Sequence, residues 1–379
     1  MTWRGALLTA LVLSVSLSRI RPSAAAKASA NITAVAEQQK MALVTKPSSH
    51  MVRTFDITLV TIATYDRMPL FKLLIERWQG PAVFLCVIEG ASQKERPKWQ
   101  KALHKAAGKG RLKMGRVYIS PTAPDEFPIN RFRNMAISKV ATSHLFYVDV
   151  DFVPSATSYQ DAKQLLLKNR EYSQDRTYAF VVPAFMYAGS CQDVKACLKQ
   201  FGDEIPGTFP QLMSQVQQRK SKVMAFGSKS AAQDSTDYDK WMSQGAEEVR
   251  PIECLSNLRY EPYVIVRKSD LLPSFDERFT GYGKNKIQWI VHLRYLGFKF
   301  MVLPQVFLTH FPHPPSDSKN SWDSGHRQRM DKLYLDFLEE LHMLAVNRGT
   351  KLQIRLCEEA SGTPEEDEDS PMIIHEDGR

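Results

Sequence analysis

The sequence predicts an α/β fold with a single Rossmann-like sheet, mixed but mainly parallel, flanked by helices. From residue 55 onward, apolar β-branched runs alternate with segments of helical spacing, which is typical of a largely parallel sheet covered on both faces. The 379 residues suffice for a sizeable core. A composition of 43% hydrophobic and 24% charged residues excludes a disordered or fibrous protein.

Each predicted element follows from the period of its apolar residues. The predicted strands span residues 56–63, 83–88, 116–119, 144–148, 263–266 and 298–303. The predicted helices span residues 70–78, 98–107, 130–140, 286–296 and 330–344. Residues 203–257 are rich in Gln, Ser and Lys, and they predict helices and loops inserted into the sheet architecture.

The two ends of the chain differ from this body. Residues 1–21 combine a basic start with a short apolar core, which predicts a signal peptide or a short signal-anchor. Residues 22–52 predict a stem or linker, 53–357 the folded domain, and 358–379 an acidic disordered tail. We therefore expect a type II membrane protein in the lumen of the Golgi or the endoplasmic reticulum, or a secreted protein if the N-terminal segment is cleaved. The membrane is then contacted only through that segment.

The charge is unevenly distributed. The whole chain carries +9, but residues 358–379 hold nine acids and one Arg, so residues 1–357 carry 49 Lys and Arg against 32 Asp and Glu, or +17. A basic body suits an anionic ligand such as a nucleotide diphosphate, an acidic glycan, a membrane surface or a nucleic acid. The signal-like N-terminus and the lack of a recognised nucleic-acid motif argue against nucleic acid.

The five cysteines are too few for a disulfide scaffold. Cys86 lies in an apolar run and is expected to be a buried thiol. Cys191 and Cys197, six residues apart, could pair in an oxidising lumen.

The clearest chemical feature is a pair of acids directly after an apolar strand. Asp149 and Asp151 alternate along the chain, so in an extended backbone both carboxylates face the same side. They stand at the carboxyl end of a strand, where open α/β sheets bind ligands. Hard oxygen ligands there suit Mg²⁺ or Mn²⁺ holding a diphosphate. The alternative is a solvated strand end with a turn that begins at Asp.

Three polar residues, Asn130, Arg133 and Asn134, lie near the start of the helix that leads into this strand. Arg133 could clamp a phosphate or stack on a base. The two asparagines, four residues apart, could form hydrogen bonds along one face of the helix. The alternative is a capped helix with surface arginines.

Two histidines follow a later apolar strand. His310 and His313 lie in a proline-rich segment, and His is a common third ligand for a divalent ion already held by carboxylates. The alternative is a structural histidine at a strand end.

Six motifs in this order resemble glycosyltransferase family 49, which includes LARGE-type and β-1,4-glucuronyltransferase-like enzymes. The resemblance covers roughly residues 55–345. The motifs lie at residues 130–134, 149–154, 182–185, 260–267, 275–286 and 303–316. Six motifs in one order are far more specific than any one of them.

The resemblance implies a GT-A fold and an inverting, Mn²⁺-dependent (or Mg²⁺-dependent) transfer from a UDP-sugar donor to a glycan acceptor on a glycoprotein or glycolipid. Glucuronic acid is the expected sugar. The alternatives are the same fold transferring xylose, galactose or N-acetylglucosamine, and a catalytically silent glycan-binding protein. Asp149, Asp151 and His310 match the metal-binding positions. The positions expected to bind the nucleotide-sugar are Asn130, Arg133, Asn134, Asp149, Gly281, Gly283 and Lys286.

Two acids are candidates for the catalytic base. Many GT-A enzymes have an acid after the Gly-x-Gly segment, whereas this chain has Asn285 and Lys286 there. The candidates are Asp276 and Glu261, with Asp276 favoured because it is nearer the Gly segment. The alternative is that either acid only pairs with a neighbouring arginine.

The same segment departs from the family at Lys284, where Trp is usual. We expect Arg278, Lys284 and Lys286 to be unpaired cations, with Lys286 binding the C6 carboxylate of glucuronic acid. The alternative is that Lys286 only caps the following helix.

Overall fold

The structure, a computed structural model, describes residues 55–89, 112–120, 127–218, 221–225, 232–314, 325–348 and 354–357, with isolated positions at 97–98, 100–101, 105 and 352. The predicted N-terminal segment, the stem and the acidic tail lie outside these residues, as does most of the predicted helix at 98–107. Among the described helices, none has the length and apolar character needed to span a bilayer.

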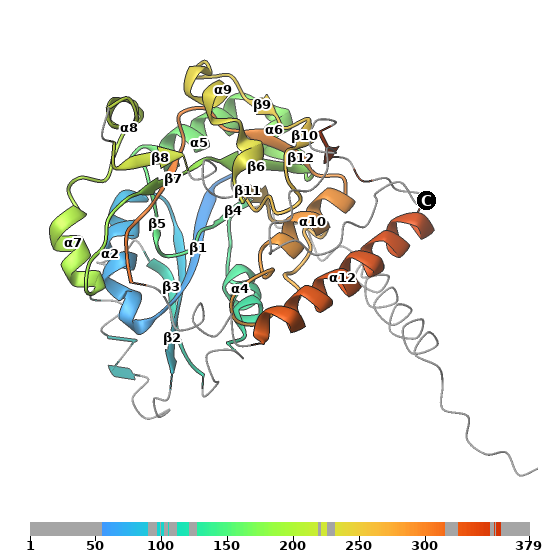
Figure 1. Ribbon diagram of the computed structural model, residues 1–379, viewed down its shortest axis with the longest axis horizontal. Helices are drawn as coiled ribbons and strands as arrows, with labels where there is room; N and C mark the ends of the chain where they lie inside the picture. Colours follow the sequence, from blue (N-terminus) through green and yellow to red (C-terminus); the bar gives the residue numbers. More distant parts are fainter. Residues whose placement is uncertain are drawn as a thin grey trace, which may run out of the picture. The chain divides into compact units, whose positions relative to one another are not determined.

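The main sheet has eight strands in the order β3-β2-β1-β4-β11-β6-β12-β9 (Figure 1). Pairing is parallel from β3 through β2 and β1 to β4, and again between β6 and β12. β11 runs antiparallel to both β4 and β6, and β9 antiparallel to β12. This confirms a mixed, mainly parallel sheet. Its strands are β1 Ile57–Thr64, β2 Ala82–Glu89, β3 Leu112–Ser120, β4 His144–Tyr147, β6 Tyr178–Val182, β9 Arg250–Pro251, β11 Tyr263–Arg267 and β12 Lys299–Val302.

A smaller four-stranded sheet has the order β5-β13-β7-β8 and was not predicted. Its strands have three or four residues, which is too short for the period-2 pattern of a half-buried strand to be recognised. They are β5 Phe152–Pro154, β7 Ala184–Tyr187, β8 Val223–Ala225 and β13 Leu308–His310. A further short pair joins β10 Cys254–Leu255 to β14 Arg355–Leu356.

Helices lie on both sides of the main sheet: in Figure 1, α2 is on one side, and α4 and α10 are on the other. The predicted helices outside 98–107 are all present, with ends shifted by a few residues; the last one begins at His326 instead of 330. The helices are α2 Met68–Arg77, α4 Ile129–Ser138, α5 Ser158–Lys168, α6 Arg170–Gln174, α7 Val194–Phe201, α8 Phe209–Val216, α9 Tyr238–Ser243, α10 Ile287–Tyr295 and α12 His326–Arg348.

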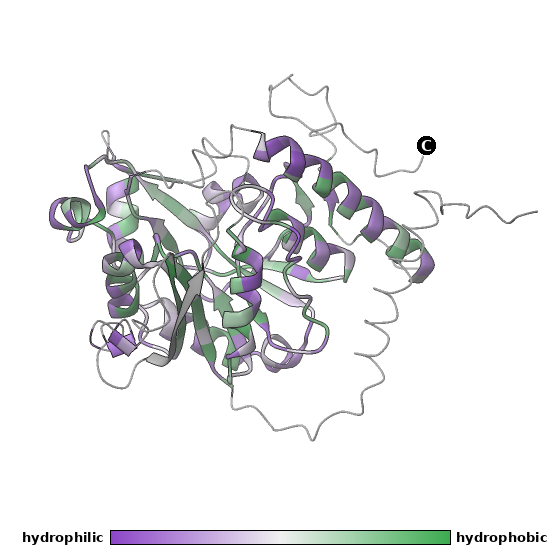
Figure 2. Ribbon diagram, turned by 90° about the horizontal axis from the view of Figure 1, so that it is seen from below, coloured by the Kyte–Doolittle hydropathy of each residue, from purple (hydrophilic) through white to green (hydrophobic). Residues whose placement is uncertain are grey.

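Large aromatic side chains fill the space between sheet and helices. Trp78, at the end of α2, is fully buried, and its ring centroid lies 5.9 Å from Phe146 and 5.1 Å from Tyr159. On the α10 side, Trp289 stacks on Phe275 at 4.6 Å. Figure 2 shows hydrophobic strands inside and hydrophilic outer faces on the helices. This close packing holds the strand ends that form the site.

The cysteines behave as predicted where a prediction existed. Cys191 and Cys197 form a disulfide, and Cys86 is a buried free thiol. Burial raises the pKa of the Cys86 thiol to about 12, so it is unreactive at neutral pH. A second disulfide, Cys254–Cys357, was not predicted; it fastens β10 to β14 across 103 residues of sequence.

The Cys254–Cys357 disulfide closes a long loop, so its removal should be costly. We expect Cys357→Ser to lower the free energy of unfolding by about 2–4 kcal/mol, measured by urea denaturation without reductant. The matched control is Cys191→Ser, which opens a loop of only six residues and should cost less. Equal unfolding midpoints for wild type and Cys357→Ser would show that this bridge does not constrain the chain.

Candidate active site

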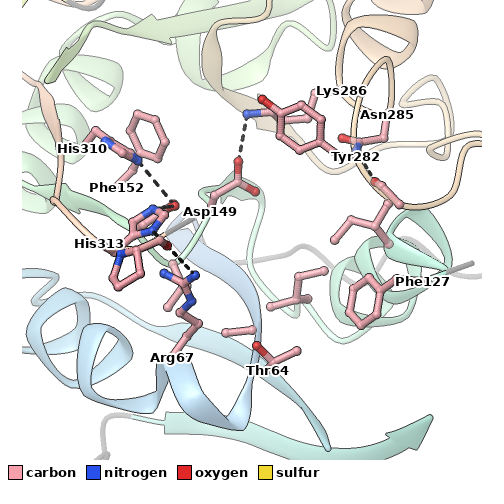
Figure 3. Close-up of a pocket in the computed structure, with 18 of the residues that line it drawn as sticks. Thr64, Arg67, Phe127, Asp149, Phe152, Tyr282, Asn285, Lys286, His310 and His313 are labelled. Atoms are coloured by element: carbon pink, nitrogen blue, oxygen red, sulfur yellow. Dashed lines mark hydrogen bonds and ion pairs between the residues drawn. The ribbon is translucent and has the colours of Figure 1, made fainter. Parts of the chain in front are cut away.

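A cleft of about 1600 Å³ opens at the carboxyl ends of β1 and β4. Its walls are the end of β1 with Thr64–Arg67, the Asp149–Phe152 segment, the loop 281–287, and the residues after β13 (Figure 3). Glu261 and the start of α7 also line it. Open α/β sheets bind ligands at this edge because the ends of several strands bring polar groups together there.

The small sheet brings Asp151 and the two histidines together. β13 pairs antiparallel with β5 so that His310 lies opposite Phe152, and the Phe311 amide donates to the Asp151 carbonyl at 2.7 Å. The Asp151 Oδ2 then lies 2.7 Å from His313 Nε2 and 3.5 Å from His310 Nε2. Burial alone would raise the pKa of Asp151, but hydrogen bonds from His310 and His313 outweigh it and hold this pKa well below its usual range.

These three side chains suit a metal ion. Asp151, His310 and His313 each offer one ligand atom, and the atoms lie within 4.8 Å of one another. Nδ1 of His313 lies 2.7 Å from the Pro314 carbonyl, so it must carry the proton that it donates. In a neutral ring, Nε2 then carries a lone pair that faces the Asp151 carboxylate oxygen at 2.7 Å. Because both atoms are hydrogen-bond acceptors, a second proton on the ring or a cation must lie between them. A donor set of one carboxylate and two imidazoles fits Mn²⁺ or a later transition metal better than Mg²⁺.

Asp149 has different partners. It accepts hydrogen bonds from the hydroxyls of Tyr147 at 2.9 Å and Tyr263 at 2.8 Å, and from Lys286 Nζ at 2.8 Å. Burial would raise the pKa of Asp149, but Lys286 and then Arg133 outweigh it and lower this pKa to about 2. The predicted metal set was Asp149, Asp151 and His310. In the structure, Asp151 and His310 group with His313, while Asp149 is held by tyrosines and a lysine.

The predicted asparagines and arginine of α4 form hydrogen bonds with segments that surround the cleft. Asn130 donates to the Asp276 carbonyl at 2.8 Å, and Asn134 donates to the Phe275 carbonyl at 2.9 Å. Both contacts hold the loop before Gly281 and lie outside the cleft lining. The predicted hydrogen bonding along one helix face is confirmed, with this loop as the partner.

Arg133 does line the cleft, but its side chain is only 3% exposed. It donates to the side chains of Asn130 and Asn285, both at 2.8 Å, and lies 3.5 Å from Asp149. Burial would lower the Arg133 pKa, but Tyr147 and Asp149 outweigh it and raise this pKa. The residue therefore ties α4, the Gly segment and Asp149 together as a permanent cation.

The Gly segment has a backbone that favours glycine. Gly281 and Gly283 have φ of 61° and 84°, a region that other residues rarely adopt. Lys284 also has a positive φ, 54°. Hydrogen bonds anchor the turn, from the Gly281 amide to the Phe127 carbonyl at 2.8 Å and from Asn285 Nδ2 to the Gly281 carbonyl at 2.7 Å.

The expectation of three unpaired cations is wrong. Arg278 pairs with Asp276 and Glu340 at 2.6 and 2.7 Å, and Lys284 lies 3.3 Å from Asp331. Lys286 is paired with Asp149, and its side chain makes no hydrogen bond that caps α10. Most of these partners are distant in the sequence, so spacing along the chain does not reveal them.

The two candidate bases lie in different places. Asp276 is outside the cleft lining and is bound by Arg278. Glu261 lines the cleft, with a carboxylate oxygen 3.8 Å from Lys286 Nζ. Burial raises the pKa of Glu261, and the nearby Lys286 offsets this only in part. A partly buried carboxylate with a raised pKa in a cleft suits the role of a general base.

Some residues in or beside the cleft escaped the prediction. Tyr147 and Tyr263 bind Asp149 but stand within apolar strands, where tyrosine suggests only packing. The polar run Thr64–Arg67 follows β1 just as the acids follow β4, and that shared pattern could have identified it. Asp331 of α12 also lines the cleft and gave no sequence signal.

The family model described as glycosyl-transferase for dystroglycan, family 49, matches residues 92–345. This chain belongs to glycosyltransferase family 49. The match spans the Asp pair, the Gly segment and both histidines. Family membership confirms the predicted resemblance, and the observed sheet is of the class that the resemblance implied.

Two curated relatives show how far the similarity extends. The glycosyltransferase-like protein gnt14 of Dictyostelium discoideum is 28% identical over 299 residues, which is 77% of this chain and 43% of that protein. The xylosyl- and glucuronyltransferase LARGE2 of Rattus norvegicus is 27% identical over 268 residues, 70% of this chain and 35% of that protein. The chain spans less than half the length of these relatives.

Among solved structures, GalNAc-T7 with UDP, GalNAc and Mn²⁺ aligns with a TM-score of 0.39 and 11% identity, covering 68% of this chain and 44% of that one. Staphylococcus aureus TarS 1–349 aligns with a TM-score of 0.38 and 12% identity, covering 67% and 60%. With TM-scores this low, neither structure bears on the chemistry of this chain.

Proposed function

We propose that this protein is an inverting glycosyltransferase that moves a sugar, glucuronic acid, from a UDP-sugar to a glycan acceptor with the help of Mn²⁺. The observation that carries the proposal is the coexistence, in one cleft of a family 49 domain, of the Asp151–His310–His313 group and the partly buried carboxylate of Glu261. The first suits a diphosphate-bound cation, and the second suits a base.

The proposed reaction divides between these groups. A hydroxyl oxygen of the acceptor attacks the anomeric carbon, Glu261 takes its proton, and the bond to UDP breaks with its electron pair on the diphosphate. Asp151, His310 and His313 would hold Mn²⁺, which supplies positive charge to the leaving diphosphate. Arg133 and Lys286 keep Asp149 ionised and in place beside this group.

A panel of UDP-sugars tests the activity itself. With Mn²⁺ present, we expect UDP release to be fastest from UDP-glucuronic acid, and expect chelation by EDTA to stop it. Preference for UDP-xylose, UDP-galactose or UDP-N-acetylglucosamine would reassign the donor. The anomeric configuration of the product, read by NMR, tests inversion. A protein that binds these donors without releasing UDP would be a silent glycan-binding protein.

Lys286 is the proposed partner of the glucuronic acid carboxylate, which would replace or share its present contact with Asp149. We expect Lys286→Met to lower kcat/KM for UDP-glucuronic acid more than for UDP-glucose by about 1–3 kcal/mol, since only the first donor has a carboxylate. The matched control is Lys284→Met, because Lys284 pairs with Asp331 and its loss should affect both donors to the same extent. Equal losses with both donors would refute the carboxylate role.

We further propose that the domain works in the lumen of the Golgi or the endoplasmic reticulum, on glycoprotein or glycolipid acceptors. The two disulfides support an oxidising compartment. Residues 1–21, which have the pattern of a signal sequence, would direct the chain into the secretory pathway.

A further inference from the structure

Two exposed aromatic rings line the same cleft. Among the large hydrophobic side chains that are exposed in the described residues, the aromatic ones are Tyr65, 40% exposed, and Tyr282, 44% exposed. Both belong to the cleft lining. Aromatic rings left open to water inside one concave site indicate a ligand with a flat or apolar face.

The backbone under Tyr282 is held rigidly. Gly281 and Gly283, on either side of it, have positive φ, the Gly281 amide is anchored to the Phe127 carbonyl, and Asn285 Nδ2 closes the turn onto the Gly281 carbonyl. Thr280 precedes Gly281, and its carbonyl accepts a hydrogen bond from His326 Nε2 of α12 at 2.9 Å. The ring is therefore presented on a preorganised support, which lowers the entropic cost of binding.

The position of the ring relates it to the proposed chemistry. In Figure 3, Tyr282 lies on the Asn285 and Lys286 side of Asp149, away from His310 and His313. Lys286 Nζ lies 3.8 Å from the Glu261 carboxylate. Tyr282 is therefore on the side of the cleft that holds the proposed base rather than on the side of the metal group.

We propose that Tyr282 is the stacking platform of the acceptor subsite, where a pyranose ring of the acceptor lies with its C–H face on the tyrosine ring and one hydroxyl toward Glu261. This rests on the proposed glycosyl transfer. The C–H bonds of a pyranose face carry partial positive charge, which matches the negative face of an aromatic ring.

A polar group next to the platform suits the hydroxyl edge of the same sugar. Asp331 lines the cleft between Lys284, at 3.3 Å, and Arg327, at 3.7 Å. All three side chains belong to the cleft lining, and together they offer hydrogen-bond donors and acceptors at the edge of a ring bound on Tyr282.

The test separates acceptor from donor binding in the full chain. The probes are UDP-glucuronic acid with Mn²⁺ and a panel of methyl pyranosides that differ in the orientation of their hydroxyls. We expect Tyr282→Ala to raise the KM for the pyranoside on the order of 10-fold, equivalent to about 1.4 kcal/mol, and to change the KM for UDP-glucuronic acid less than about 2-fold. Tyr282→Phe keeps the ring and should behave like wild type.

Tyr65→Ala is the matched control, because Tyr65 is similarly exposed in the same cleft but follows β1. It should leave the KM of the pyranoside close to that of wild type. A larger donor effect than pyranoside effect in Tyr282→Ala overturns the proposal, and so does a wild type that releases UDP but uses none of the pyranosides. A wild type that releases no UDP from any UDP-sugar would instead defeat the proposed function.

Discussion

Asp151→Asn is expected to abolish metal-dependent turnover, with a loss on the order of 1000-fold or more, because the metal site supplies several kcal/mol of charge stabilisation to the leaving diphosphate. The carboxylate is the one anionic ligand in the Asp151–His310–His313 group. The amide retains the shape but not the charge, so the affinity for Mn²⁺ should fall as well. Electron paramagnetic resonance of free Mn²⁺ measures that loss without any turnover.

Asp149→Asn provides the comparison, since it tests the metal set expected from the sequence against the group that the structure assembles. Asp149 is engaged by Tyr147, Tyr263 and Lys286, so its loss should disturb the Mn²⁺ affinity less than the loss of Asp151. Equal losses of Mn²⁺ affinity would restore Asp149 as a direct ligand. Wild-type Mn²⁺ binding by Asp151→Asn would remove the metal site altogether.

Glu261→Gln is expected to reduce kcat by about 10²- to 10⁴-fold, the usual contribution of a general base, with little change in the KM for the donor. The substitution is nearly isosteric and removes only the group that takes the proton. Asp276→Asn is the control, because Asp276 pairs with Arg278 outside the cleft lining and should retain most of the activity. A greater loss in Asp276→Asn than in Glu261→Gln would reverse the assignment.

The pH dependence of the rate follows from the same carboxylate. Its pKa is raised above the ordinary 4.5, first by burial, so a protonated fraction persists at a higher pH than for an exposed glutamate. Since the base must be ionised, kcat should fall as the pH drops through this raised pKa, and the residual rate of Glu261→Gln should lack that acidic limb.

The raised pKa of Glu261 also affects stability. Ionised Glu261 disfavours the folded state above that pKa, so the thermal midpoint of Glu261→Gln at neutral pH should be no lower than that of wild type.

Short-range patterns explain why so much of the fold was predictable. The long buried strands β1 and β2 are continuous apolar runs, the helices α2 and α4 carry a helical apolar period, and α10 is a longer, largely apolar segment. The β5-β13-β7-β8 sheet was missed because strands of three or four residues have no period to recognise. That sheet aligns His310 with Phe152, and thereby brings the second histidine, His313, to Asp151.

The α/β class, the strand-end acids, the later histidines and the family could be read from the amino-acid sequence, because each depends on residues close together in the chain or on motifs in a fixed order. The partners of the charged side chains became known only from the folded structure. Asp149 is bound by Lys286, 137 residues away. Asp276 is bound by Arg278 and lies outside the cleft lining, whereas Glu261 belongs to that lining. The energy of a charge depends on its burial and on the opposite charges within a few ångströms, and those distances exist only after the chain has folded.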